Sequence, residues 1–186
     1  MNKKEIKKLL GTEFAIIYND INPVIQSLNL DQQTNILDVG TGKGRMAITL
    51  ALNGYKVITG EPESDNSEYA KQDWLIDAKK VKVDSFITYK PFDAEKMPFE
   101  DNYFDAIFIL GALHHMNNPA SAFKECIRIT KKNGKICAVE PLSHRIDTIR
   151  QRFSDHPDPV DPRDYADGLH VKITEGIMFK AFAFTK

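Results

Sequence analysis

The sequence has few cysteines, no long apolar run and no excess of either charge, and each shortage excludes a class of protein. The 186 residues include two cysteines, Cys126 and Cys137, without the CxxC spacing of a zinc or disulfide framework. No apolar run approaches the roughly 20 residues that cross a bilayer. The net charge of −1 offers no general attraction for nucleic acid or for an anionic membrane. We therefore expect a cytoplasmic protein with reduced thiols that acts on neither nucleic acid nor membranes.

The N-terminus starts with basic residues but lacks the long apolar core and the cleavage site of a signal peptide, so we expect none. The length, with 42% apolar and 27% charged residues, suits one globular domain. We expect a single domain over residues 1–186, in which residues 1–30 form a helical cover and residues 31–186 form the core.

Strand and helix patterns alternate along the chain. Short apolar runs predict strands at 35–39, 55–59, 85–89, 104–110 and 135–140, and helical spacing predicts helices at 3–10, 13–28, 45–52, 67–80 and 120–130. The second of these helices should break or kink near Pro23. Two alternating segments, 170–176 and 177–186, predict an antiparallel hairpin, and the proline-rich residues 155–168 predict a surface connection. Together these patterns predict an α/β fold, a Rossmann-like doubly wound sheet that is mostly parallel with an antiparallel C-terminal strand and helices on both faces.

Three glycines stand between the first predicted strand and the helix that follows it. In ILDVGTGKGR, Gly40, Gly42 and Gly44 occupy every second position, whereas a purely structural turn would need one. Glycine adopts positive φ and lets the backbone approach a ligand closely, so this loop predicts a ligand at the start of the helix. The spacing differs from the G-x-G-x-x-G dinucleotide fingerprint and from the phosphate-binding P-loop.

Acidic residues follow the next two predicted strands. Glu61 comes after the second strand, where a carboxylate can accept two hydrogen bonds from a ribose diol, and Glu63 is a nearby competitor. Asp93 comes after the third strand, where its carboxylate could accept a hydrogen bond from an adenine amine. Most carboxylates on loops are simply exposed and bind nothing. The prediction that these two bind a ligand therefore depends on their position at the ends of strands.

These motifs, in this order, resemble the class I S-adenosylmethionine-dependent methyltransferases, in particular the small-molecule branch called type 11. The resemblance rests on ILDVGTGKGR, VITGEP, DAEKMPFEDNYFD, LGALHHM and RITKKNGKICAVEP, and it covers roughly residues 30–186. It implies S-adenosyl-L-methionine as the cofactor and methyl transfer to an unidentified small molecule. Two alternatives stay open. One is a non-catalytic protein that binds S-adenosylmethionine or a nucleotide, and the other is an NAD-dependent oxidoreductase, which the glycine spacing and the antiparallel tail disfavour.

The resemblance also implies which residues contact the cofactor. They are Asp38, Gly40, Thr41, Gly42, Gly44, Glu61, Asp93, Ala94 and Leu110. Among them, Asp38 would lie near the methionine amino group, and Glu61 would hold both ribose hydroxyls. Asp93 would read adenine through its side chain and Ala94 through its backbone N–H, while Leu110 would line the cofactor beside the transferred methyl. Thr41 stands where the family frequently has Cys or Ser, and we expect no consequence.

A pair of histidines follows the fourth predicted strand, where the acceptor would lie. We predict His115 rather than His114 as the catalytic residue, because the second histidine of the family's pair usually points inward; a packing role is the alternative. With His144 and His156 these residues could form a metal cluster. Adjacent histidines are expected to point differently, however, and no ligand spacing supports a site, so we predict no metal.

Residues 1–30 and 141–168 are the segments left to shape an acceptor pocket. We predict an open or small pocket lined by Tyr18, His115, Glu140, Arg145 and Phe153. An anionic small molecule would pair with Arg145 or Arg150. The sequence does not indicate the oligomeric state.

Overall fold

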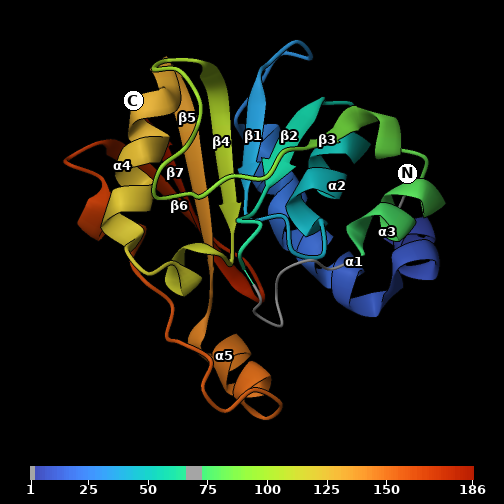
Figure 1. Cartoon of the computed structure of the whole chain (residues 1–186). Helices are drawn as coiled ribbons and strands as arrows, with labels where there is room; N and C mark the ends of the chain where they lie inside the picture. Colours follow the sequence, from blue (N-terminus) through green and yellow to red (C-terminus); the bar gives the residue numbers. More distant parts are fainter. Residues whose placement is uncertain (1–2, 66–72) are drawn as a thin grey trace.

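The computed structural model describes residues 3–65 and 73–186, and these residues form one seven-stranded sheet (Figure 1). The strands lie in the order β3-β2-β1-β4-β5-β7-β6. Their bounds are β1 Ile36–Val39, β2 Val57–Gly60, β3 Ile87–Tyr89, β4 Phe104–Leu110, β5 Thr130–Pro141, β6 His170–Glu175 and β7 Phe179–Thr185. Strands β1 to β5 pair in parallel, whereas β7 runs antiparallel to both β5 and β6. The predicted sheet, mostly parallel with a reversed C-terminal strand, is confirmed.

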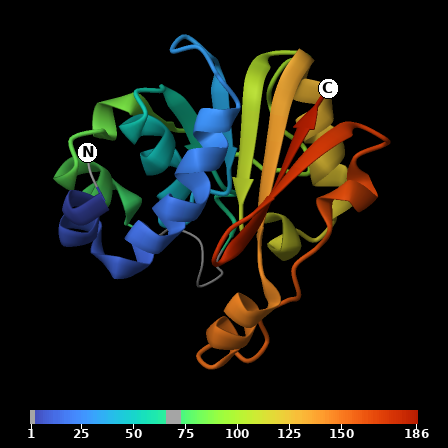
Figure 2. The same cartoon turned by 180° about the vertical axis from the view of Figure 1, so that it is seen from behind.

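Helices cover both faces of the sheet, as predicted. The helices are α1 Lys3–Ser27, α2 Arg45–Leu52, α3 Trp74–Lys80, α4 Pro119–Ile129 and α5 Ser143–Arg150. Helices α1, α2 and α3 lie on one face and α4 on the other, while α5 stands beyond one end of the sheet (Figures 1 and 2). The predicted helix 67–80 is described from Trp74 onward, and residues 66–72 lie outside the described part. Within residues 3–65 and 73–186, no helix is both long and apolar enough to cross a membrane.

The apolar strand β4 is buried because both of its faces are covered. Ala106 and Phe108 pack into the core beneath α1 and α2, whereas Ile107 and Ile109 pack into the second core beneath α4. Successive side chains of a strand point to opposite faces, so a continuous apolar run is what a central strand needs. The loop between β3 and β4 contributes apolar side chains to the second core in place of a crossover helix.

The long helix α1 bends at Gly11, between the two helices predicted at 3–10 and 13–28, whereas the break predicted near Pro23 is wrong. Gly11 has non-helical angles of φ 88° and ψ 171°, and Pro23 lies inside the helix. A proline in a helix interior costs about 3 kcal/mol. Ile21, Val24 and Ile25 flank it and are buried, and each such burial stabilises by roughly 1.5–3 kcal/mol, which outweighs that cost.

The hairpin at the C-terminal end is fixed to α1 by one carboxylate. The two oxygens of Asp20 accept hydrogen bonds from the backbone N–H groups of Ile177, Met178 and Phe179, at 3.0, 2.6 and 3.3 Å. These N–H groups belong to the turn and to the start of β7. The predicted hairpin is therefore present, and a helix distant in sequence holds its turn.

Three segments differ from the sequence-based expectation. Helix α5 was not predicted, because its polar sequence SHRIDTIR buries Ile146 alone. Strand β5 starts five residues before the predicted residue 135, and the turn at Asn133 lies inside it as an irregularity of register with β4. Residues 155–168 are not purely a surface connection, since a short 3₁₀ helix, Pro162–Tyr165, packs against α4 and His156 and Ala166 are buried.

Both cysteines are free and fully buried, one in each core. Cys126 lies on α4 and Cys137 on β5. Burial raises the pKa of each thiol to about 12. Neither thiol has the exposure or the low pKa of a reactive cysteine.

Candidate active site

The glycine loop lies at the carboxyl ends of the parallel strands. Gly40 and Gly44 have φ values of 88° and 67°, a region that other residues rarely adopt. The N–H of Gly40 donates to the carbonyl oxygen of Gly60 at 3.0 Å, which joins the loop to the end of β2. A Cβ atom on Gly40 would lie 2.7 Å from the Cβ of Ala112, so the segment after β4 sits directly against the loop.

Glu61 is buried at the end of β2 and points at this loop. Its Oε2 accepts a hydrogen bond from the N–H of Gly42 at 2.9 Å. Its own carbonyl oxygen accepts from Phe92 N–H, at 3.3 Å, which brings the segment after β3 to the same place. The residues predicted from three separate motifs therefore meet at one edge of the sheet. The competitor Glu63, by contrast, is exposed.

Asp38 is fully buried at the end of β1 within a line of hydroxyl groups. Its Oδ2 accepts from the hydroxyl of Thr59 at 2.8 Å, and that hydroxyl lies 3.0 Å from the hydroxyl of Thr41. Oδ1 of Asp38 is buried without a hydrogen-bond partner among the described residues. Burial raises the pKa of Asp38 to about 8, although the Thr59 hydroxyl lowers it. Thr41 thus has a packing role that the sequence did not indicate.

Asp93 and Ala94 stand on a tight turn after β3. Asp93 is exposed, and its Oδ1 accepts from Glu95 N–H at 2.8 Å, whereas Ala94 is buried. Glu95 in turn accepts from the N–H of Asn118 at 2.8 Å, and the side chain of Asn118 caps the start of α4. The turn that was predicted to meet adenine is therefore tied to α4.

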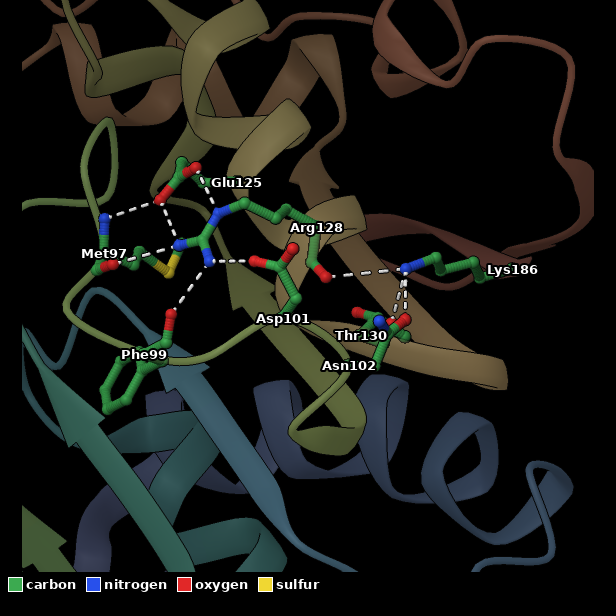
Figure 3. Close-up of polar contacts among 8 residues, drawn as sticks. All are labelled: Met97, Phe99, Asp101, Asn102, Glu125, Arg128, Thr130 and Lys186. Atoms are coloured by element: carbon green, nitrogen blue, oxygen red, sulfur yellow. Dashed lines mark hydrogen bonds and ion pairs between the residues drawn. The ribbon is translucent and has the colours of Figure 1, made fainter.

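Arg128 extends this connection along the rest of the loop (Figure 3). From α4 its guanidinium donates to the carbonyl oxygens of Met97 at 3.0 Å and Phe99 at 2.9 Å. It also pairs with Asp101 and Glu125, both at 2.7 Å. This residue was not predicted from the sequence, because Met97, Phe99 and Asp101 lie 27–31 positions before it in the chain.

The two histidines after β4 are oriented in the opposite sense to the prediction. His114 is buried and His115 exposed, both on a short 3₁₀ helix, Leu113–His115, that follows the half-buried Leu110. Nδ1 of His114 lies 2.6 Å from Oε2 of Glu140 at the end of β5. The contact with this buried carboxylate orients His114 inward. The inward orientation expected for His115 is therefore wrong. The catalytic role of His115 stays a prediction.

The histidines also lie closer together than predicted. The ring centroids of His114 and His115 are 4.3 Å apart, although His114 is buried and His115 exposed. His156 joins them from the connection after α5, whereas His144 bonds the carbonyl oxygen of Ile177 instead. The protein packed around the ring of His115 lowers its pKa, although part of the side chain is exposed, and the neighbouring His114 and His156 lower it further.

Arg145 forms an ion pair with Glu13, whose side chain is partly exposed. Its Nη2 lies 2.5 Å from Oε1 of Glu13 on α1, and Oε2 of the same carboxylate lies 2.9 Å from Arg45 at the start of α2. Tyr18, half-buried on α1, packs against the core beneath that helix, and burial raises its pKa. Glu13 thus connects the N-terminal helix to the elements on either side of the site.

Two depressions of the described surface lie at the opposite edge of the sheet, near the amino ends of the strands. One, of about 390 Å³, includes Asp105 and Lys131, which form an ion pair with each other. Neither contains the positive-φ glycines or the buried acids. We therefore place the candidate site at the carboxyl edge, where ligands bind in open α/β sheets.

Comparison with known proteins gives a consistent result. Residues 37–138 match the model of a family described as "Methyltransferase domain". Over 124 residues, 63% of this chain and 48% of the relative, the sequence is 35% identical to a ubiquinone biosynthesis O-methyltransferase of Alkalilimnicola ehrlichii. Over 101 residues, 54% of this chain and 36% of the relative, it is 29% identical to a 27-O-demethylrifamycin SV methyltransferase of Amycolatopsis mediterranei. The chain thus spans less than half the length of these curated relatives.

A solved structure shares the whole fold. A SAM-dependent methyltransferase from Aquifex aeolicus superimposes with a TM-score of 0.68 over 100% of this chain and 98% of that one, at 20% sequence identity.

Proposed function

The chain belongs to the methyltransferase-domain family, and we propose that it transfers the methyl group of S-adenosylmethionine to a small molecule. The observation that carries this proposal is the hydrogen bond from Gly42 N–H to Oε2 of Glu61 at 2.9 Å. It holds a carboxylate against the glycine loop, where the same group would accept hydrogen bonds from the two ribose hydroxyls.

The groups around the loop fit the cofactor. Oδ1 of Asp38 is buried without a partner in residues 3–65 and 73–186, and the ammonium of the methionine part would satisfy it. Asp93 and the N–H of Ala94 would hold adenine, and Leu110 would line the cleft beside the methyl. When bound, S-adenosylmethionine supplies a sulfonium methyl that is already activated for transfer. The protein's own task is to align the acceptor and to exclude water.

On the acceptor side, we assign His115 the role of taking a proton from the acceptor. The neutral imidazole is the form that accepts a proton, but the surrounding protein lowers the pKa of His115 to about 3, so this role requires that the bound acceptor raise that pKa. Tyr18 would shield the site from α1, and Glu140 would orient His114 beside it. Nε of Arg145 is buried without a hydrogen-bond partner among the described residues. An anionic group of the acceptor would accept a hydrogen bond from this N–H.

The nature of the acceptor follows from charge. A net charge of −1 gives no field for a polyanion, so we propose a small metabolite rather than a nucleic acid, and cytoplasmic action. Replacing Arg145 with alanine should weaken an anionic acceptor without changing the affinity for S-adenosylhomocysteine. A loss of S-adenosylhomocysteine affinity instead would contradict the assignment.

The cofactor site is tested by calorimetric titration of S-adenosylhomocysteine against Glu61→Gln. Hydrogen bonds to a charged group contribute about 1.5–3 kcal/mol, so affinity should fall roughly 10- to 100-fold. The matched control is Glu63→Gln, which changes an exposed acid two residues away and should leave affinity unchanged. Equal losses in the two variants would refute the site.

Catalysis is tested separately by a labelled-methyl screen over metabolite pools with the purified protein. Transfer to a small molecule supports the proposal. Tight S-adenosylhomocysteine binding without any transfer would favour the non-catalytic alternative, and binding of NADH in its place would favour an oxidoreductase.

A further inference from the structure

Three histidines from two separate segments converge beside the candidate site. His114 and His115 follow β4, and His156 lies about 40 residues later in the connection after α5. One ring nitrogen from each lies within 4.8 Å of the others. The fold rather than any sequence spacing creates this cluster, so the absence of a ligand motif does not argue against a metal.

A hydrogen bond to Glu140 fixes the tautomer of His114. Its Nδ1 lies 2.6 Å from the carboxylate of Glu140, and because a carboxylate only accepts, Nδ1 carries the proton. The lone pair is then on Nε2, which is buried without a hydrogen-bond partner among the described residues, in a side chain that is 1% exposed. A metal-binding histidine commonly donates its other N–H to a carboxylate in this way.

His156 is oriented in the same manner. Its Nδ1 lies 2.9 Å from the carbonyl oxygen of Pro157, so Nδ1 is again the donor and Nε2 carries the lone pair. Arg150 fixes the backbone at this point, because its Nε and Nη2 donate to the carbonyl oxygen of His156 at 2.9 and 2.7 Å. Two of the three rings are therefore held with defined tautomers.

We propose that His114, His115 and His156 bind one zinc ion, with a fourth position open to solvent. Three neutral imidazoles suit zinc, whereas magnesium and calcium prefer oxygen ligands. Zinc–nitrogen bonds of about 2.0–2.1 Å place tetrahedral ligands about 3.3 Å apart, so the rings must close by up to about 1.5 Å. The exposed side chain of His115 provides the route of entry.

The proposed zinc ion would also activate the methyl acceptor. This role rests on the proposed function, whereas zinc binding itself does not. The 3₁₀ helix with His114 and His115 follows β4 at the same edge as the glycine loop, so the fourth position would face the acceptor. There the metal would lower the pKa of an acceptor hydroxyl or thiol, which is the task otherwise assigned to His115.

The test adds Zn²⁺ to metal-free protein in the absence of cofactor and acceptor, so it is independent of methyl transfer. Competition with a chromophoric chelator and elemental analysis should give one zinc ion per chain. Co²⁺ in its place should give the intense visible absorption of a four-coordinate site. Absence of stoichiometric binding, or a six-coordinate cobalt spectrum, would overturn the proposal.

Variants then locate the site. His156→Gln should weaken zinc binding more than about 100-fold, and Glu140→Gln about 10- to 100-fold by removing the carboxylate charge that makes His114 a stronger ligand. His170→Gln is the matched control, since His170 is exposed at the start of β6. Thermal unfolding of the metal-free variants verifies that each has folded. An equal loss of zinc affinity in His170→Gln and His156→Gln would contradict the assignment.

Discussion

Replacing Arg128 with lysine should release the loop that carries Asp93 and Ala94 from α4. The guanidinium of Arg128 bonds two backbone carbonyls and two carboxylates at once (Figure 3). Lysine keeps the positive charge, but a single ammonium cannot reach both Met97 and Phe99 while it pairs with an acid. The variant therefore tests the loss of the multiple hydrogen bonds of the guanidinium without a loss of positive charge.

The magnitude follows from the two lost carbonyl bonds. A hydrogen bond from a charged group contributes about 1.5–3 kcal/mol, and the lower end applies because the Arg128 side chain is 32% exposed. We expect the free energy of unfolding to fall by about 2–3 kcal/mol. For a chain of this size, each kcal/mol lowers the melting temperature by about 2–4 °C, so the shift should be roughly 5–10 °C.

Calorimetry measures this shift, and hydrogen exchange at residues 93–101 reports the loop itself. Arg163→Lys is the matched control, because that guanidinium is 55% exposed and pairs with Asp161 two residues away. It should leave the melting temperature essentially unchanged. If the two variants lose equal stability, or if exchange in the loop is unchanged in Arg128→Lys, the reasoning fails.

Three further predictions concern other contacts. Folding raises the pKa of Asp38 to about 8, so between about pH 4 and pH 8 the folded state holds a proton that the unfolded state has lost. The free energy of unfolding should therefore fall as the pH rises from about 4 to 8. Urea titrations should show that Asp38→Asn removes this dependence on pH. Asp20→Ala leaves three backbone N–H groups without their acceptor and should lower the melting temperature by roughly 5–12 °C in calorimetry. Gly40→Ala should weaken S-adenosylhomocysteine binding at least tenfold in titrations. Gly168→Ala should not, because Gly168 has a similar positive φ but no atom lies within 4 Å of an added Cβ. Equal binding by the two variants would contradict a role for close packing at Gly40.

The sheet could be predicted because its signals are local. Each parallel strand is a short apolar run, and the run at 104–110 is apolar on both faces because two cores cover it. Helix α5 was missed because a helix with one buried residue has almost no apolar pattern. The bend at Gly11 falls between the two helices predicted at 3–10 and 13–28. The break expected at Pro23 is absent because the cost of that proline is local, whereas the burial that outweighs it depends on tertiary packing.

The arrangement around the glycine loop was easier to predict than the arrangement of the histidines. Glu61 and the glycine loop follow consecutive strands, so topology alone brings them together. The orientation of His114 depends on Glu140, 26 residues later, and the position of His156 depends on how an irregular connection folds back. Such contacts have no fixed spacing, and sequence patterns cannot find them.

The two buried thiols have a practical consequence for spectroscopy. Cys126 and Cys137 are 0% and 1% exposed, so maleimide dyes will not reach them while the protein is folded. A single cysteine introduced on the surface of α1 or α5 would then carry a fluorophore without prior removal of the native residues. Pairs of such labels would report whether the N-terminal helix and α5 move relative to each other when ligands bind.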